Sequence, residues 1–498
     1  MLNFHGHTAK PRQLRKAQMS VEQVIASINN VLWGEGQVLI YVLLFAGFWF
    51  SVKLKFVQFL NFRHMFAVMR NSAKGTDDGG ENGSGISSLQ ALFIGLSARV
   101  GTGNLAGVAV AISLGGSGAI FWMWVIALLG MATGFAESVL GQLYKVNDDH
   151  KEYRGGPAYY IQKGLNQRWL AVLFSICLFL GYGFSFSAMQ ANTIADSLNH
   201  AFNIPSLYSG AVITALAGLI VLGGLKRIAR FAELIVPFMG IAFILVAVAI
   251  TLMNINLVPA MLYDILTSAF GLQEAGAGML GAAIKNGIQR GLYSNEAGAG
   301  SVPHAAASAR PVPNHPVTQG YVQMLGVFLD TMVLCTCTAV IILLADINIG
   351  GEMEGIRLTQ NAITYHLGAN GVYFVSAAIS LFAFTSVVAN YAYAESNLHF
   401  FKLDNKVGRT IYTVMYLAMV FWGSSASLKQ VWSMADVALG LMTLVNVVAI
   451  VQLTPTIVAL MKDYNAKRKL ENSTEADMEF KANDIELQGR LHKGIWDK

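Results

Sequence analysis

The sequence predicts an all-α, multi-pass membrane protein with about eleven transmembrane helices, each about 20 residues long. Three observations lead to this prediction. Of 498 residues, 54% are hydrophobic and only 13% are charged, whereas soluble domains carry about 25% charged residues. Apolar runs long enough to cross the hydrocarbon core of a bilayer recur along most of the chain. Basic residues gather in alternate loops between these runs, as in other multi-pass proteins.

We expect two sets of five spans and one additional N-terminal helix. Residues 1–35 are expected to form a polar tail with a short amphipathic stretch, and 36–87 to hold the additional helix and a basic loop. The two sets cover 88–255 and 256–462, and the charged tail 463–498 is expected to be solvated. The expected spans lie at 37–52, 88–114, 118–144, 169–198, 208–224, 231–254, 276–300, 318–345, 372–395, 410–426 and 431–461.

The charges of the loops predict an orientation. One set of alternate loops is basic, whereas the other carries only Arg357 and Lys429. Because cytoplasmic loops are the ones enriched in Lys and Arg, we expect the C-terminus in the cytoplasm and the N-terminus in the periplasm. Four basic residues of the N-terminal tail, from Lys10 to Lys16, oppose this orientation. The basic loop residues are Lys53, Lys55, Arg63, Arg70, Lys74, Lys145, Lys151, Arg154, Lys163, Arg168, Lys226, Arg227, Arg230, Arg310, Lys402, Lys406, Arg409, Lys462, Lys467, Arg468 and Lys469.

Two of the expected spans are interrupted by polar residues and glycines. The middle of 88–114, from Ala98 to Asn104, contains an arginine, two glycines and a threonine. The segment 276–300 is rich in Gly and Ala but also holds charged residues. Each interrupted span is the first of a set of five. Because five is an odd number, the second set enters the membrane from the opposite face and is inverted relative to the first. Interrupted helices at matching positions of two halves are typical of inverted-repeat secondary transporters, whose site lies between them near the midplane.

Backbone groups freed at the first interruption can bind ions and charged ligands. Non-helical backbone at membrane depth is tolerated only where protein buries it or where it lines a wet cavity. The carbonyls freed between Ala98 and Val100 suit a hard cation such as Na⁺. The freed N–H groups of Thr102 and Gly103 suit a carboxylate, since the N-terminal end of a half-helix is positive.

Hydroxyl and carboxyl groups within the later spans are candidates for the same cation site. The adjacent hydroxyls of Thr385 and Ser386 lie in mid-span, where they either bind a cation or donate to carbonyls of their own helix. Asp330 is an intramembrane carboxylate, and such groups indicate function by default. The alternative for Asp330 is a structural pair with Arg99 or Lys285.

Amide side chains and the second interruption complete the candidate residues. The Asn104 oxygen can contribute to a cation shell, and Gln190 either contacts the substrate or forms an interhelical hydrogen bond. Ser294 and Asn295 mirror the first interruption. Arg99 is expected to pair with buried carboxylates such as those of two glutamates, at positions 137 and 296, rather than to bind substrate.

Several classes of protein are excluded by what the sequence lacks. It has no phosphate-binding loop, no metal-ligand spacing, no nucleophile with a nearby base and no stretch long enough for a nucleotide-binding domain. We therefore expect no enzyme activity, no nucleic-acid partner and no obligate protein partner. No cleavable signal peptide is expected. The three cysteines, Cys177, Cys335 and Cys337, lie in apolar runs and are expected to be buried thiols.

The run from Gly115 to Gly130, GGSGAIFWMWVIALLG, strongly resembles the signature of the alanine/glycine:cation symporter family, also called sodium:alanine symporters. Supporting stretches lie at 98–104, 155–160, 291–298 and 328–331, and the resemblance covers about 30–460. It implies the LeuT-like inverted five-plus-five fold of the amino acid–polyamine–cation superfamily. It also implies uptake of a small neutral amino acid, alanine or glycine first, coupled to Na⁺ or H⁺ across a bacterial plasma (inner) membrane.

The resemblance also implies roles for the substrate candidates. Thr102 and Gly103 would hold the amino acid carboxylate, and Gln190 would face the substrate. The segment around Ser294 and Asn295 would supply the second broken helix.

For the coupling ion, the resemblance implies the common sodium site of the fold. Thr385 and Ser386 match its paired hydroxyls, with carbonyls supplied near Ala98 and Val100. Asn104 and Asp330 are candidates for a second cation or for a structural pair.

One departure from the family concerns the substrate. Many members have Gly-Trp shortly after the paired hydroxyls, where this chain has Ala389 and Asn390. Without the indole wall, a larger or more polar substrate such as serine or glutamine becomes plausible. Two further alternatives are a proton-coupled exchanger on the same fold and a non-transporting sensor.

Overall fold

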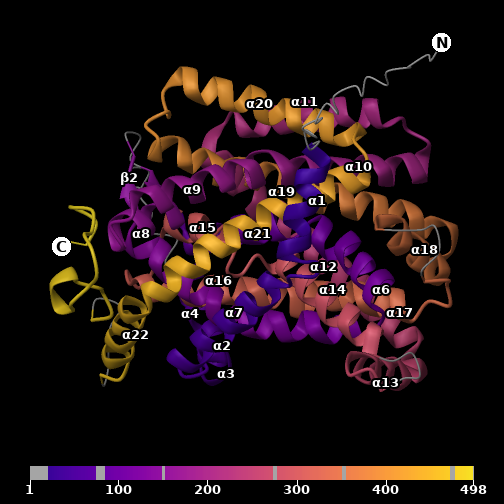
Figure 1. The fold of residues 1–498 in the computed structure, drawn as a ribbon, viewed down its shortest axis with the longest axis horizontal. Helices are drawn as coiled ribbons and strands as arrows, with labels where there is room; N and C mark the ends of the chain where they lie inside the picture. The colour runs from indigo at the N-terminus through magenta and orange to yellow at the C-terminus, as the bar shows by residue number, and fades with distance from the viewer. Residues whose placement is uncertain are drawn as a thin grey trace, which may run out of the picture.

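The computed structural model describes residues 21–74, 85–148, 152–272, 277–349, 355–470 and 477–496. Long helices pack side by side through almost all of this part of the chain (Figure 1). The glycine-rich end of the predicted loop at 53–87 lies partly outside the described residues. The helices of the first half are α1 (Val21–Leu32), α2 (Val38–Lys53), α3 (Val57–Leu60), α4 (Phe62–Lys74), α5 (Ser88–Arg99), α6 (Val108–Gly115), α7 (Gly118–Leu143), α8 (Pro157–Gly164), α9 (Arg168–Leu178), α10 (Phe186–Phe202), α11 (Ser206–Val221) and α12 (Gly224–Met253).

The second half is also mostly helical. Along the described chain, three π-helical segments each lead directly into the α-helix that follows. These segments are η2 (Gly103–Gly107), η3 (Phe179–Ser185) and η5 (Phe328–Cys335). The helices of the second half are α13 (Val258–Ala269), α14 (Ala277–Asn295), α15 (Val302–Ser308), α16 (Pro316–Val327), α17 (Thr336–Leu343), α18 (Ile356–Leu367), α19 (Gly371–Phe400), α20 (Lys406–Ser425), α21 (Leu428–Gln452) and α22 (Thr454–Arg468).

The described helices include six that are long and apolar enough to cross a membrane, and a seventh if the bent pair α5 with Gly103–Gly115 counts as one. The multi-pass prediction is therefore confirmed, whereas its number of spans is not. The other four expected spans correspond to α2, α11, α14 and α20, which are shorter or more polar. Large apolar side chains exposed at helical spacing along α12 (Leu234, Phe238, Ile241, Leu245) suit a face in contact with lipid.

Two predictions about the C-terminal region are wrong. The last span ends at Gln452, not at 461, because Pro455 cannot continue α21 and instead occupies the first turn of α22. The tail is not wholly solvated: Phe480 and Trp496 are each 2% exposed. These two aromatic residues lie far apart in a charged segment, so the sequence has no periodic apolar pattern there that predicts their burial.

Short elements gather at one end of the helical bundle, on the left of Figure 1, where β2, α8, α22 and the C-terminal segment lie together. The strands β2 (Val146–Asn147) and β3 (Tyr153–Arg154) pair antiparallel, and β1 (Ile86–Ser87) pairs parallel with β4 (Ala309–Arg310). We call this the basic end, because most of the basic loops predicted to share one side lie here. The amphipathic helix α1 packs instead against the start of α21, where Asn29 donates to the Ser433 carbonyl.

A cavity between two helix breaks

The first break interrupts a buried span at the predicted position. α5 ends at Arg99, and the next helical segment departs from it at an angle of 49°. The freed N–H of Gly101 donates to Asn104 Oδ1 at 3.0 Å. The freed N–H of Thr102 donates to Gln190 Oε1 at 2.9 Å, and so does the Thr102 hydroxyl at 2.6 Å. The break therefore presents N–H groups that donate to an oxygen acceptor, and here side-chain amide oxygens are the acceptors.

The second break lies between α14 and α15 and is held by a buried carboxylate. Glu296, at φ +58°, and Gly298 and Gly300 all have left-handed backbone conformations. The Glu137 carboxylate of α7 accepts hydrogen bonds from the N–H groups of Gly298 at 3.1 Å and Gly300 at 3.2 Å. Asn446 of α21 donates to the same carboxylate at 2.8 Å. The Glu137 carboxylate therefore holds the backbone of the second break, and it does not line the cavity described below.

The two breaks touch each other. A Cβ atom placed on Gly103 would lie 3.1 Å from Ser294 Cα, so the first break approaches the second at van der Waals distance. Asp330 of η5 joins both: its carboxylate accepts from Asn104 Nδ2 at 2.8 Å and from Ser294 Oγ at 2.7 Å. Thr331 adds a third neutral donor at 2.8 Å. Asp330, Asn104 and Ser294 thus form one buried cluster.

The paired hydroxyls of α19 lie against the first break. Ser386 Oγ donates to the Ser97 carbonyl at 2.8 Å and lies 3.4 Å from the Val100 carbonyl. Ser97 Oγ in turn donates to the Thr385 carbonyl at 3.0 Å. The Thr385 hydroxyl donates to the Phe382 carbonyl of its own helix at 2.8 Å, the alternative considered from the sequence. Oxygen atoms from two helices therefore converge here, with Ser97 as an additional contributor.

A small cavity opens beside this convergence. Ala98, Gln190 and Asn390, three of the predicted residues, line it, and the amide oxygen of Asn390 has no hydrogen-bond partner among the described residues. Asn295 is not among the lining residues; its Oδ1 instead accepts from the Ala297 N–H at 3.0 Å. Two further lining residues, Arg99 and Glu296, were conspicuous in the sequence but were expected to pair with each other rather than to line a cavity. The remaining lining residues could not be predicted, because aromatic and aliphatic side chains in apolar spans resemble ordinary core: Tyr182, Phe186, Tyr293 and Leu439.

Arg99 does not form the ion pairs expected of it. The side chain is buried, and none of its three guanidinium nitrogens has a hydrogen-bond partner among the described residues. The guanidinium packs against Gly326 of α16, where a Cβ atom would lie 2.2 Å from one of its nitrogens. The structural pair between Asp330 and Arg99 or Lys285 is likewise not formed, since the groups that donate to the Asp330 carboxylate within the described chain are neutral.

An ion pair closes the side of the cavity away from the basic end. Arg290 binds Asp436 through two hydrogen bonds of 3.1 Å each, and its guanidinium lies 4.4 Å from the centre of the Trp432 ring. Arg290 is one helical turn from Tyr293, and Asp436 is one turn from Leu439, and both of these neighbours line the cavity.

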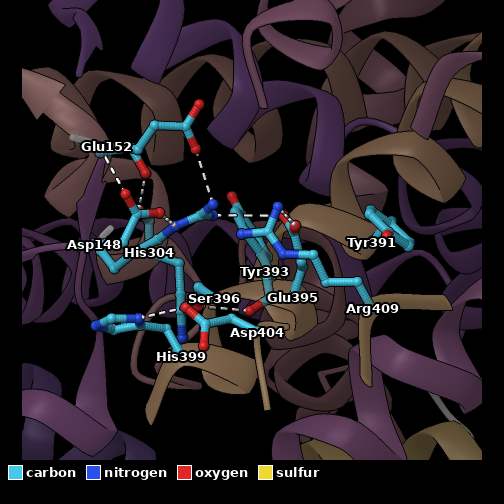
Figure 2. Close-up of polar contacts among 12 residues, drawn as sticks. Asp148, Glu152, His304, Tyr391, Tyr393, Glu395, Ser396, His399, Asp404 and Arg409 are labelled. Atoms are coloured by element: carbon cyan, nitrogen blue, oxygen red, sulfur yellow. Dashed lines mark hydrogen bonds and ion pairs between the residues drawn. The ribbon is translucent and has the colours of Figure 1, made fainter. Parts of the chain in front are cut away.

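Charged residues also gather on the side of the basic end, where Figure 2 shows Asp148, Glu152, Glu395 and Arg409 close together. Arg154 of the β2–β3 hairpin binds Asp148 at 3.0 Å, Glu152 at 2.8 Å and Glu395 of α19 at 3.5 Å. Burial acts to lower the pKa of Arg154, but the three carboxylates outweigh it and hold that pKa above its usual value. Glu395 also lies 3.6 Å from Arg409 of α20. This cluster, which we call the Arg154 cluster, links the hairpin to the helix that carries Ser386.

Among the described residues, no group of three or more His, Cys, Asp or Glu side chains is arranged to hold a metal ion. Cys177 and Cys335 are buried, as predicted, whereas Cys337 is partly exposed.

Comparison with known proteins identifies the family. The model of the sodium:alanine symporter family matches residues 18–478. The chain is 44% identical over 457 residues to the amino-acid carrier protein AlsT of Bacillus subtilis, covering 92% of this chain and 94% of that one. It is 42% identical over 452 residues to the probable sodium/glutamine symporter GlnT of Bacillus subtilis, covering 91% and 92%.

A solved structure shows the same fold. The structure of MhsT in complex with L-phenylalanine matches with a TM-score of 0.54 at 14% identity, over 80% of this chain and 93% of that one. The architecture is therefore the LeuT-like fold of secondary transporters. With a family model that matches nearly its whole length, the chain belongs to the sodium:alanine symporter family.

Proposed function

We propose that this protein is a sodium-coupled symporter for a small neutral amino acid, alanine or glycine first. The observation that carries the proposal is the convergence of the Ser386 hydroxyl with the carbonyls of Ser97 and Val100, directly beside the cavity. Hydroxyl and carbonyl oxygens are ligands of hard cations. Thr385 and the carbonyl of Ala98, next to Ser97, would complete the shell. A cation here holds the first break against α19.

The substrate would bind at the same break. Its carboxylate would take the place of the Gln190 oxygen on the N–H of Thr102, with Gly103 contributing a second N–H. Gln190 and Asn390 would then turn their amides to the rest of the substrate. Because cation and substrate order the same unwound backbone, each improves the site for the other, and the coupling is reciprocal.

Asp330 is the proposed site of a second cation, Na⁺ or H⁺. Its carboxylate, with Asn104 and Ser294, joins the two breaks in the buried interior. A carboxylate buried among neutral groups is costly, and a bound cation or proton offsets that cost. A proton at this position would also account for the proton-coupled exchanger considered as an alternative.

We further propose a place for the protein in the cell. The basic end faces the cytoplasm of a bacterial cell, the start of α21 faces the periplasm, and alternating access moves the substrate inward across the inner membrane. The clustering of Lys and Arg at one end supports this orientation.

Uptake of a panel of labelled amino acids into proteoliposomes tests the function. We expect alanine or glycine uptake that requires an inward sodium gradient and persists when the pH is equal on both sides. Uptake driven only by a proton gradient would support the exchanger, and the absence of uptake or exchange of any amino acid would support the non-transporting sensor.

The same panel tests a second substrate class, serine or glutamine. The unpartnered oxygen of Asn390 in the cavity favours it, and so does the name of the GlnT relative. If the amide selects polar substrates, Asn390→Trp should shift competition toward alanine and glycine. An unaltered competition profile would show that Asn390 does not contact the substrate.

A further inference from the structure

The segment 477–496, which we call the C-terminal strap, packs across the basic end. It lies beyond the part of the chain that the family model matches, except for its first two residues. Phe480 and Trp496 pack against each other with ring centres 5.3 Å apart, and both are buried. Figure 1 shows this yellow segment beside α22 and α8. A solvated tail would not bury two aromatic side chains that lie sixteen positions apart, so the strap is a folded part of the protein.

One group of strap contacts holds the ends of α7 and α16. The Trp496 indole donates to the Leu143 carbonyl at 2.9 Å. The Phe480 N–H donates to the Asn314 carbonyl at 3.0 Å, just before α16 begins. Tyr144, which follows α7, donates its hydroxyl proton to the Gln488 carbonyl at 2.5 Å. α7 and α16 pack on each other and on the two broken helices, so these anchors belong to the part of the bundle that carries the breaks.

A second group of contacts holds α8. The Arg490 N–H donates to the Lys163 carbonyl at 3.0 Å. Gly489, at φ +76°, lies so close to α8 that a Cβ atom on it would be 2.0 Å from the carbonyl oxygen of Lys163. α8 packs mainly against α9, whose continuation α10 carries Gln190 on the other side of the cavity. The strap therefore bridges the helices that carry the breaks and the helices that face them.

The strap also covers the hairpin of the Arg154 cluster. Lys145 Nζ lies 5.1 Å from the centre of the Trp496 ring and 3.9 Å from that of Tyr153, and it donates to the Ala309 carbonyl at 3.0 Å. Burial, with a smaller effect from Arg310, holds the pKa of Lys145 well below its usual value. Trp496 thus forms part of the packing that fixes the hairpin over the route from the cavity.

We propose that the C-terminal strap is a brake that holds the basic end closed. The strap has to detach from either α8 or Leu143 before the cavity can open to that side. The proposal rests on the transport function proposed above. Opening separates the helices with the breaks from those that face them, and the strap is an added connection between these two groups. Its removal favours the open form without touching the cavity or the cation site.

Accessibility of a cysteine tests the brake independently of transport. Ser396, buried beside Glu395, is replaced by Cys in a protein that also carries Cys337→Ser, since Cys337 is partly exposed. The labelling rate by a small thiol reagent is then measured in membranes in the presence of Na⁺. We expect Trp496→Ala, and deletion of 479–498, to raise that rate several-fold.

Two variants serve as comparisons. Gly489→Ala displaces the strap from Lys163 while leaving Trp496 intact, and we expect it to raise labelling in the same way. Asn483→Ala changes an exposed strap residue and should leave the rate unchanged. Unchanged labelling in Trp496→Ala, Gly489→Ala and the deletion would overturn the proposal. Because labelling needs no substrate, a protein that transports no amino acid would still answer this question.

Discussion

Gly101 is the residue on which both halves of the proposed site depend. A Cβ atom here would lie 2.4 Å from Ser386 Oγ and 2.7 Å from Gln190 Oε1. No side chain fits without displacing the hydroxyl on the cation side, the amide on the substrate side, or both. The glycine therefore allows close approach of three segments rather than an unusual backbone conformation.

We predict that Gly101→Ala abolishes coupled uptake while the protein still folds and reaches the membrane. Gly107→Ala is the matched control, because its Cβ would meet its nearest neighbours at 3.7 and 3.8 Å, ordinary contact distances. Sodium-dependent uptake of both variants, measured at equal membrane abundance, checks the prediction. Uptake by Gly101→Ala equal to that of Gly107→Ala would show that the close approach is unimportant.

Most of the polar candidates could be found from the sequence, because a polar group in an apolar span is conspicuous. Thr102 and Gln190 are joined by hydrogen bonds, and Asn104, Asp330 and Ser294 form a second hydrogen-bonded set. The partners of these residues could not be found in the same way. Which carbonyl faces a hydroxyl depends on the bend of the broken helix, and the sequence gives only the position of the break.

At the scale of elements, the contact between α5 and α19 distinguishes the two paired hydroxyls. Ser386 reaches across to the carbonyls of α5, whereas Thr385 bonds within α19. We predict that Ser386→Ala lowers the apparent sodium affinity more than Thr385→Ala does. A lost hydroxyl ligand corresponds to about 1–2 kcal/mol, or about a tenfold change in affinity.

Sodium activation of uptake, measured at saturating amino acid, checks this order. Substrate selectivity should change little in either variant, since neither hydroxyl lines the cavity. If sodium activates uptake in both variants as it does in the unmodified protein, the cation binds elsewhere, and Asp330 is the next candidate.

Elements with strong periodicity were predictable, and those defined by tertiary contacts were not. The amphipathic stretch at 21–33 appears as α1, and the interrupted span appears as α5 with its bent continuation. The hairpin of β2 and β3, by contrast, has two residues in each strand, too few for an alternating pattern. Ion pairs of Arg154 with nearby Asp148 and with Glu395 of α19 hold it, and loop charges alone do not predict the distant partner.

At the scale of the whole molecule, the cavity is closed at both ends by ion pairs. Arg290 and Asp436 close the end near the start of α21, and Arg154 and Glu395 close the basic end. Side chains of all four residues are at most 10% exposed, so these pairs are poorly screened by solvent. Breaking either pair should shift the population of conformations toward the form open at that end.

We predict that Glu395→Gln raises the substrate KM measured from the outside, whereas Asp436→Asn raises the KM measured from the inside. Each charge-assisted hydrogen bond lost is worth about 1.5–3 kcal/mol, and apparent affinity falls with the fraction of molecules open to the tested side. Right-side-out and inside-out vesicles give the two constants. Arg409→Gln is the control, because Arg409 is 31% exposed, lies 3.6 Å from Glu395 and leaves the Arg154 pair in place. Equal changes from both sides in the Glu395 variant would mean that its ion pair stabilises the fold without controlling which end opens.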